Sequence, residues 1–358
     1  MGYQKVFLLD VSTIESATTE TVSQRENNLA HKLTLPQSNM TNQADYPFAR
    51  LQNPSCWEKT KMFVGLLTLV PLRMTLVLLS CVVGGTLTIA LHTLGLRWLS
   101  RATLRMTCRT LLFCLGYVRI TVIGALPSPC PTIVCSNHVS LVEVLHLVTL
   151  FDEISFVTKS TIFNIPMIGR IARDVVECIG VNRGSRAKTN LLTTTQYIVK
   201  RAEEGRTLAI FPEGTTSNGR QLLTFKKGAF VPSLPVLPIL YSFPNSGSFL
   251  PTYESILTSV YFWRTLCQPW NNLQCSILPS IEPVKHDGLS ATQSAEIFAE
   301  QVREEMARSL GVKTINQGYR DKLEYHELLR RQYGEHRRGP MYAMIFEPTI
   351  SAEKMKRI

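Results

Sequence analysis

The hydrophobic and polar positions divide the 358-residue chain into four parts. Residues 1–58 are rich in Ser, Thr, Asn and Gln and contain no long apolar run, which predicts a disordered N-terminal arm. Residues 59–110 are largely apolar, and residues 111–312 alternate short β-branched runs with longer amphipathic segments. Residues 313–358 are charged and predict a basic tail that is helical or extended.

The longest apolar segment covers residues 74–96, which carry no formally charged side chain. A helix rises 1.5 Å per residue, so a helix over this segment is about 35 Å long and can cross a bilayer. The apolar residues 63–72 leave a second arrangement open, a re-entrant hairpin bent at Pro71 and Arg73. Both arrangements place residues 59–110 in or at a membrane.

Four arginines follow at steps of four residues: Arg97, Arg101, Arg105 and Arg109. This spacing places them on one side of a helix whose other positions are mostly apolar. The pattern is typical of a helix that lies at an anionic headgroup layer, and a solvated helix face has the same pattern.

Strand-like and helix-like segments alternate from residue 111 onward. This order predicts an α/β domain with a mixed or mostly parallel sheet flanked by helices, preceded by the membrane-embedded helical segment. The segments are strands at 118–123, 132–135, 154–158, 207–211 and 236–241, and helices at 141–150, 188–204 and 290–310.

The net charge of +11 suits a nucleic acid or an anionic membrane surface as partner. The sequence has no zinc-finger spacing and no recognition-helix pattern, so the long apolar segment favours the membrane, and no nucleic-acid partner is expected. The nine cysteines include no C-x-x-C pair, which argues against a disulfide framework or a structural metal site. A domain on the reducing, cytosolic side of a membrane is the simpler inference.

Two side chains with acid–base chemistry follow the strand predicted at 132–135. His138 comes directly after Ser136 and Asn137, and Glu143 lies five residues further on. If His138 lies in the turn and Glu143 in the first helical turn, the carboxylate can accept the proton of one ring nitrogen while the other nitrogen acts as a base. A His followed by an unrelated acid is the alternative, because such spacings also arise by chance.

A second turn, FPEGTT at residues 211–216, ends another apolar run. The carboxylate of Glu213, the N–H of Gly214 and the hydroxyls of Thr215 and Thr216 could hold hydroxyl and phosphate oxygens. An ordinary strand-ending turn with a satisfied Glu213 is the alternative.

These motifs resemble the four sequence blocks of the membrane-bound glycerolipid acyltransferases, over roughly residues 59–312. The blocks correspond to Asn137–Glu143, Gly180–Arg183, Phe211–Thr215 and Leu234–Ile239. The chain departs from the family pattern at Glu143, where most members have Asp. One methylene moves the carboxylate by about 1.5 Å, and such a shift can cost about 10²-fold in rate. An inactive homologue that serves as a membrane adaptor therefore remains an alternative.

The resemblance implies transfer of a fatty acyl chain from acyl-CoA, a co-substrate, to the free hydroxyl of a lysophospholipid, with no other cofactor. It implies that His138 is the general base and Glu143 its partner, and that Arg183 binds the acceptor phosphate. Asn137, Glu213, Gly214, Thr215 and Thr216 are expected to position the acceptor, and Lys226 and Lys227 either contact coenzyme A or cover the surface. No metal is expected, because His138 and Glu143 have no third ligand at a recognisable spacing.

Residues 214–230 resemble the branch that acylates lysophosphatidylcholine and lysophosphatidylethanolamine. Acylation of glycerol-3-phosphate or lysophosphatidate is the other enzymatic alternative. The last residues, 354–358 (KMKRI), resemble the dilysine signal of endoplasmic-reticulum membrane proteins, which implies that membrane, with the catalytic domain on its cytosolic side.

Overall fold

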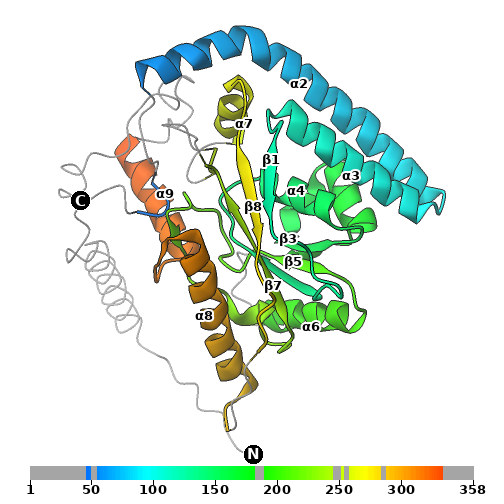
Figure 1. Ribbon diagram of the computed structural model, residues 1–358, viewed down its shortest axis with the longest axis vertical. Helices are drawn as coiled ribbons and strands as arrows, with labels where there is room; N and C mark the ends of the chain where they lie inside the picture. The colour runs from blue at the N-terminus through cyan, green and yellow to red at the C-terminus, as the bar shows by residue number, and fades with distance from the viewer. Residues whose placement is uncertain are drawn as a thin grey trace, which may run out of the picture. The chain divides into compact units, whose positions relative to one another are not determined.

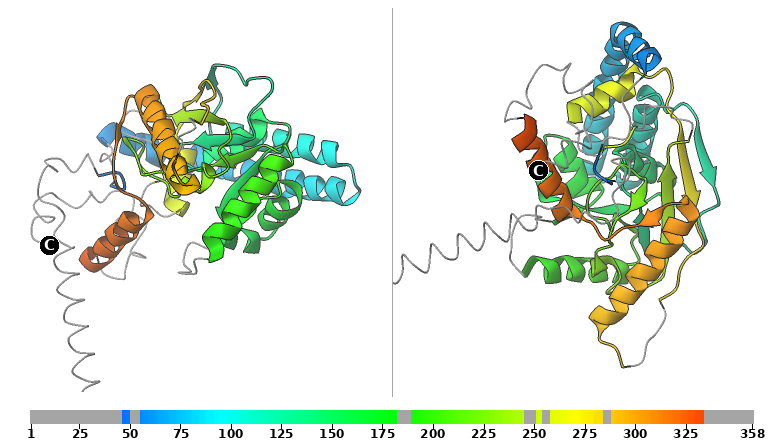
Figure 2. Two further views of the ribbon diagram at one scale, coloured as in Figure 1. Left: turned by 90° about the horizontal axis from the view of Figure 1, so that it is seen from below. Right: turned by 90° about the vertical axis from the view of Figure 1, so that its left-hand side faces the viewer.

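A helical hairpin opens the long described part of the chain (Figure 1). The computed structural model describes residues 46–49, 55–181, 189–244, 251–253, 258–283 and 288–333, all within one unit, Ala44–Thr349. The first helix, α2 (Cys56–Thr93), begins where the hydroxyl of Ser55 accepts the N–H of Glu58 at 3.2 Å. The chain turns at residues 94–96, and α3 (Arg97–Cys114) lies beside α2 in each view (Figures 1 and 2).

The predicted helix over 74–96 is part of a longer one. α2 is one continuous helix of 38 residues that includes Pro71, so the alternative of a re-entrant hairpin bent at Pro71 and Arg73 is wrong. Arg73 instead caps the end of α7 (Thr258–Cys267): Nη1 donates to the carbonyl oxygen of Leu266 at 3.0 Å, and Nη2 donates to that of Pro269 at 2.7 Å. Among the described helices, α2 is long and apolar enough to cross a membrane.

The central sheet has seven strands in the order β1-β8-β7-β2-β5-β3-β4. Every neighbouring pair is parallel except β7 and β8, so β1 and β8 run opposite to the other five strands. The predicted mixed, mostly parallel sheet is therefore confirmed. The strands are β1 (Ile120–Ile123), β2 (Ile133–Ser136), β3 (Ser155–Lys159), β4 (Ile179–Val181), β5 (Leu208–Ile210), β7 (Val236–Ser242) and β8 (Leu273–Ile277).

Helices and a small second sheet complete the described fold. The remaining helices are α4 (Val142–Leu150), α5 (Ile168–Arg170), α6 (Thr189–Glu203), α8 (Ala291–Leu310) and α9 (Tyr319–Tyr333), with short 3-10 or π turns at 160–164, 171–175 and 227–229. The second sheet pairs β6 (Gln221–Leu222) with β9 (Lys313–Thr314) in parallel.

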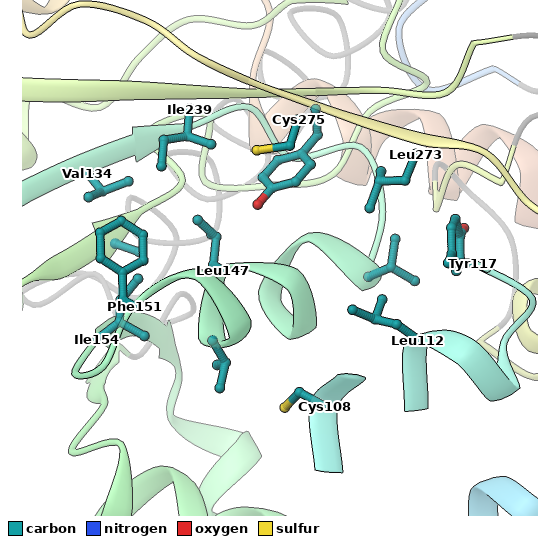
Figure 3. Close-up of a cluster of buried hydrophobic side chains, with 14 of the residues drawn as sticks. Cys108, Leu112, Tyr117, Val134, Leu147, Phe151, Ile154, Ile239, Leu273 and Cys275 are labelled. Atoms are coloured by element: carbon teal, nitrogen blue, oxygen red, sulfur yellow. The ribbon is translucent and has the colours of Figure 1, made fainter. Parts of the chain in front are cut away.

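Alternating side chains of the sheet enter two separate cores. Val134 of β2 packs with α3 and α4, whereas its neighbours Ile133 and Cys135 pack with α6 and α8. Figure 3 shows the first core, in which Leu147 and Phe151 lie against sheet residues that include Val134. Because both faces of the central strands are buried, the sequence of β2 is a nearly continuous apolar run. β2 is the middle strand of the sheet, so the residues that follow it lie at the centre of one sheet edge.

The predicted arginine stripe faces the protein at two of its positions. Arg101 donates to Glu153 at 2.8 Å, and Arg105 pairs with Asp152 in the same loop between α4 and β3. The expectation of a headgroup-facing side is therefore wrong for these two arginines. Apolar side chains such as Met106 lie on the exposed face of α3 instead.

Residues 46–49 of the predicted disordered arm are packed. Tyr46, Phe48 and Ala49 are buried, and α2 begins at Cys56, so the prediction of disorder is wrong for 46–49 and from Cys56 onward. Residues 1–45 lie outside the described residues.

Candidate active site

The two predicted motifs meet because of the strand order. β2 and β5 are adjacent and parallel, with Cys135 paired to Ile210. The carboxyl ends of two such strands lie at the same edge of the sheet, so the segments that follow them, 137–141 and 211–220, come together there.

His138 and Glu143 are in direct contact at this edge. Nδ1 of His138 lies 2.9 Å from Oε2 of Glu143, and the exposed fraction of the side chain is 16% for His138 and 0% for Glu143. With the carboxylate ionised, Nδ1–H is the donor and Nε2 is the basic nitrogen of the ring. The pair thus has the geometry of a general base and the acid that orients it.

The extra methylene of Glu143 is accommodated by the loop. Its second oxygen, Oε1, accepts the backbone N–H groups of Val139 at 2.9 Å and Ser140 at 2.7 Å. These two bonds fix the backbone of the loop just before α4, whose N-cap is Leu141. Burial raises the pKa of Glu143 above its usual range, and the two N–H donors act in the opposite direction.

The FPEGTT turn holds the backbone of His138 on both sides. Oε1 of Glu213 accepts the His138 N–H at 2.8 Å, and the N–H of Ser217 donates to the His138 carbonyl oxygen at 3.1 Å. The imidazole is stacked on the ring of Phe211, with centroids 4.2 Å apart and planes at 24°. Position and orientation of the ring are therefore set by the second motif as well as by Glu143.

Glu213, which was predicted to contact the acceptor, binds the protein backbone with both of its oxygens. Its side chain is buried, and its other oxygen accepts the N–H of Leu223 at 3.2 Å. Burial raises its pKa to about 8, while the two N–H donors and the ammonium of Lys322 act to lower it. Glu213 thus joins His138 to the segment after the turn, which agrees with the alternative of a satisfied turn carboxylate.

Asn137 also binds the protein itself. Its Nδ2 donates to the carbonyl oxygen of Tyr241 at 2.9 Å, and its Oδ1 accepts the Tyr241 N–H at 2.8 Å. The amide continues the pairing of β2 with β7 by one position and is buried. The structure therefore corrects the predicted acceptor contact of Asn137 to a bond that fixes the end of β2.

The other predicted residues separate into those at the site and those elsewhere. Gly214 has a φ of +67°, and a Cβ there would lie 2.7 Å from Nζ of Lys226, so that lysine lies across the turn. Lys227 pairs with Glu296 of α8 at 2.5 Å. The two lysines therefore do not act as a pair.

The remaining predicted site residues are Thr215, Thr216 and Arg183. Thr215 and Thr216 are both buried in the turn. The predicted phosphate ligand Arg183 lies outside the described residues. Among the described residues, no group of three or more His, Cys, Asp or Glu side chains is placed to hold a metal ion.

Two contributors carry no local signal in the sequence. The hydroxyl of Tyr261 in α7 lies 2.6 Å from Oγ of Ser140, and Nζ of Lys322 in α9 donates to Thr216. Both are more than 100 residues from their partners and belong to no recognisable motif.

Residues 119–242 match the protein-family model described as Acyltransferase. The chain therefore contains an acyltransferase-family domain, and the resemblance predicted from the motifs is confirmed. Its curated relatives include the lysophospholipid acyltransferase LPEAT1 of Arabidopsis thaliana, which is 32% identical over 205 residues, 56% of this chain and 50% of that protein. Lysophosphatidylcholine acyltransferase 1 of Danio rerio is 29% identical over 231 residues, 63% of this chain and 43% of that protein.

The chain spans about half or less of the length of these two relatives. Among solved structures, it is similar to the 1-acyl-sn-glycerophosphate (LPA) acyltransferase PlsC from Thermotoga maritima. That match has a TM-score of 0.49 and 18% sequence identity, and it covers 71% of this chain and 98% of that one.

Proposed function

We propose that this protein is an acyl-CoA-dependent O-acyltransferase that acylates the free hydroxyl of a lysophospholipid. The observation that carries the proposal is the 2.9 Å contact between His138 and Glu143, in a loop whose backbone is fixed by the FPEGTT turn. The family match and the relatives named as lysophospholipid acyltransferases support the reaction class.

In the proposed reaction, Nε2 of His138 removes the proton of the acceptor hydroxyl as its oxygen attacks the thioester carbon. The carbon–sulfur bond then breaks, and the imidazolium returns the proton to the leaving sulfur of coenzyme A. Glu143 keeps the proton on Nδ1 and stabilises the imidazolium between these steps. General-base catalysis of this kind contributes about 10² to 10⁴ in rate.

The acceptor phosphate is expected to meet positive charge near the turn. Lys226 is exposed and lies across Gly214, next to the segment that holds His138. We assign Lys226 to a phosphate of the acceptor or of coenzyme A, and Arg183 to the acceptor phosphate by its place in the family block. Lys227 is a weaker candidate, because Glu296 already pairs with it.

The α2–α3 hairpin is proposed to bind the bilayer. Large apolar side chains are exposed along both helices, among them Phe63, Leu67, Leu78, Val82, Trp98 and Phe113. The first half of α2 packs on α7 through Met62, and its second half packs on α3 and against Met167. A helix attached to its own domain along both halves lies along that domain, so we place the hairpin in one leaflet.

The endoplasmic-reticulum membrane, with the domain on the cytosolic side, is part of the same proposal. The cytosolic side is supported by the nine cysteines, none of which is in a disulfide within the described residues.

Full-length protein, purified and reconstituted in phosphatidylcholine vesicles, tests the reaction. Labelled acyl-CoA would be offered with lysophosphatidylcholine, lysophosphatidylethanolamine, lysophosphatidate or glycerol-3-phosphate, using wild type, His138→Ala and His138→Gln. We expect transfer to one of the first two acceptors and its loss in both variants. Preference for the last two acceptors would identify the other enzymatic alternative, and background transfer by wild type to all four would favour a non-catalytic adaptor.

A further inference from the structure

Two segments outside the acyltransferase-family match contact the end of the FPEGTT turn and the residues that follow it: helix α9 at Thr216 and residues 46–49 at Asn218. We propose that Lys322 of α9 is a positioning residue for acyl transfer, acting through Thr216 on the backbone of His138. The inference rests on the proposed function, because it concerns the rate of the same reaction.

Lys322 is a buried cation that donates hydrogen bonds to the turn. Its exposed fraction is 6%, and its Nζ donates to the carbonyl oxygen of Thr216 at 2.7 Å and to Oγ1 of the same residue at 2.8 Å. The ammonium also lies 5.8 Å from the ring centroid of Phe48. Burying an ammonium is costly unless such partners compensate, and an apolar side chain would fill the same space without that cost. A lysine at this position therefore points to a need for its two directed hydrogen bonds.

A short path joins Thr216 to the proposed base. The next residue, Ser217, donates its N–H to the carbonyl oxygen of His138. Glu213, which lies three residues before Thr216, accepts the N–H of His138. A shift of the turn thus moves both peptide groups of His138. A displacement of about 1 Å at a catalytic group can cost about 10²-fold in rate.

Residues 46–49 bind Asn218, two residues after Thr216. Nδ2 of Asn218 donates to the carbonyl oxygens of Tyr46 at 2.8 Å and Ala49 at 3.1 Å. The ring of Tyr46 packs on Tyr325 of α9, with centroids 5.0 Å apart. Residues 46–49 and α9 therefore pack on each other, and both bind the segment 216–218. Lys322 contributes a charged contact to this segment.

The charge of Lys322 also acts on Glu213. The ammonium lowers the pKa of that carboxyl, as do the N–H groups of His138 and Leu223, whereas burial and the nearby Glu143 raise it. Lys226 lies across the turn at Gly214. Loss of Lys322 would leave Glu213 harder to ionise and a weaker acceptor for the His138 N–H.

Four variants of the full-length protein test the proposal: Lys322→Met, Thr216→Val, the double variant, and Arg320→Met. Arg320 is exposed on the same helix and serves as the matched loss of one cation. The measurements are kcat and KM for acyl-CoA across pH, melting temperature, and the ring nitrogen signals of ¹⁵N-labelled histidines. The signals of His138 are identified by their loss in His138→Ala.

We expect Lys322→Met to lower kcat about 10- to 100-fold with KM changed less than about twofold. The rising limb of its kcat–pH profile should move to higher pH, because a carboxyl without its cation ionises at higher pH. Thr216→Val should give a smaller loss, the double variant should match Lys322→Met alone, and Arg320→Met should match wild type.

A kcat within about threefold of wild type in Lys322→Met would overturn the proposal, as would a loss equal at every pH and additive with Thr216→Val. If wild type itself transfers no acyl group, the proposed function fails. The histidine spectra still decide the positioning role in that case: the His138 signals should move in Lys322→Met and not in Arg320→Met, and unmoved signals would refute it.

Discussion

The backbone N–H of His138 donates to Oε1 of Glu213 at 2.8 Å, across 75 residues of sequence. One buried carboxylate thus ties the strand that carries the proposed base to the turn of a neighbouring strand. Its second oxygen accepts the N–H of Leu223, so both oxygens serve the protein backbone. The FPEGTT motif therefore contributes to the site first by fixing the position of His138.

Glu213→Gln tests this role with little change in shape. A Gln side chain has one oxygen and one NH₂ group, so one of the two backbone N–H groups would face a donor. An unsatisfied buried N–H costs about 1–3 kcal/mol, and we expect the melting temperature and kcat to fall, kcat by about 10²-fold. KM for both substrates should change little, because Glu213 is buried away from them.

Enzyme kinetics and thermal unfolding of Glu213→Gln check the prediction, with Glu282→Gln, an exposed Glu, as the matched control. A rise in KM for the acceptor with kcat unchanged would show that Glu213 binds substrate after all.

Glu143→Asp gives the residue that the family pattern favours, and we expect it to lower activity in this protein. The Glu143 side chain reaches Nδ1 of His138 with one oxygen and two backbone N–H groups with the other. Removing a methylene withdraws the carboxylate by about 1.5 Å, which should reduce kcat by about 10- to 100-fold. The measurement is kcat for acyl transfer, and an Asp variant as active as wild type would contradict the geometric argument.

Much of the fold could be predicted from hydrophobic pattern. The strand predicted at 236–241 is found at Val236–Ser242, because a short continuous apolar run suits a strand buried on both faces. The helix predicted at 290–310 is found at Ala291–Leu310, because its apolar residues recur at helical spacing. The turn between α2 and α3 could not be predicted as readily. Pro71 suggested a bend, but packing of α2 on α3 and α7 keeps the helix continuous.

The site divides in the same way between local and distant contacts. The contact of His138 with Glu143 could be inferred because the two residues are only five positions apart in the sequence. Few backbone conformations of such a short segment bring the two side chains together. The roles of Asn137 and Glu213 could not be inferred. The residue type alone does not show whether a side-chain amide or carboxylate binds the backbone or a ligand. Lys322 was missed because its contact with Thr216 spans 106 residues and belongs to no motif.

Asn137→Ala separates a positioning role from an acceptor contact. The variant loses both bonds to the backbone of Tyr241 and leaves its buried N–H and C=O without these partners. We expect a stability loss of about 1–3 kcal/mol and a fall in kcat, with acceptor KM unchanged. Steady-state kinetics with an acceptor titration provide the measurement. A selective rise in acceptor KM would restore the predicted acceptor contact.

The buried carboxyls predict how stability varies with pH. Burial raises the pKa of Glu213 to about 8, above its value in the unfolded chain, so the folded protein holds a proton that the unfolded chain releases. The contribution of Glu213 to stability should therefore fall as pH rises toward about 8. His146, whose pKa burial lowers to about 4, acts oppositely, but only below its unfolded pKa of about 6.5.

Melting temperatures measured between about pH 6.5 and pH 8 follow this contribution, because the window lies above the ordinary pKa of His and below that of Cys. The wild-type melting temperature should decrease across this window, and the decrease should be smaller in Glu213→Gln, which does not titrate there. A melting temperature that rises across the window would contradict the assigned direction.

The exposed face of α2 should bind lipid in proportion to its apolar surface. Leu78 and Val82 are 59% and 57% exposed and lie one helical turn apart, so Leu78→Glu combined with Val82→Glu places two charges at the proposed lipid contact without entering a core. Each acidic residue within a bilayer costs about 2.5–3.5 kcal/mol, and we expect flotation with phosphatidylcholine vesicles to weaken at least about tenfold. Ile297→Glu changes an apolar side chain of α8 that is 43% exposed, and it should float like wild type. Equal loss in both proteins would indicate general misfolding, which circular dichroism would detect, and equal binding in both would place the membrane contact elsewhere than on this face of α2.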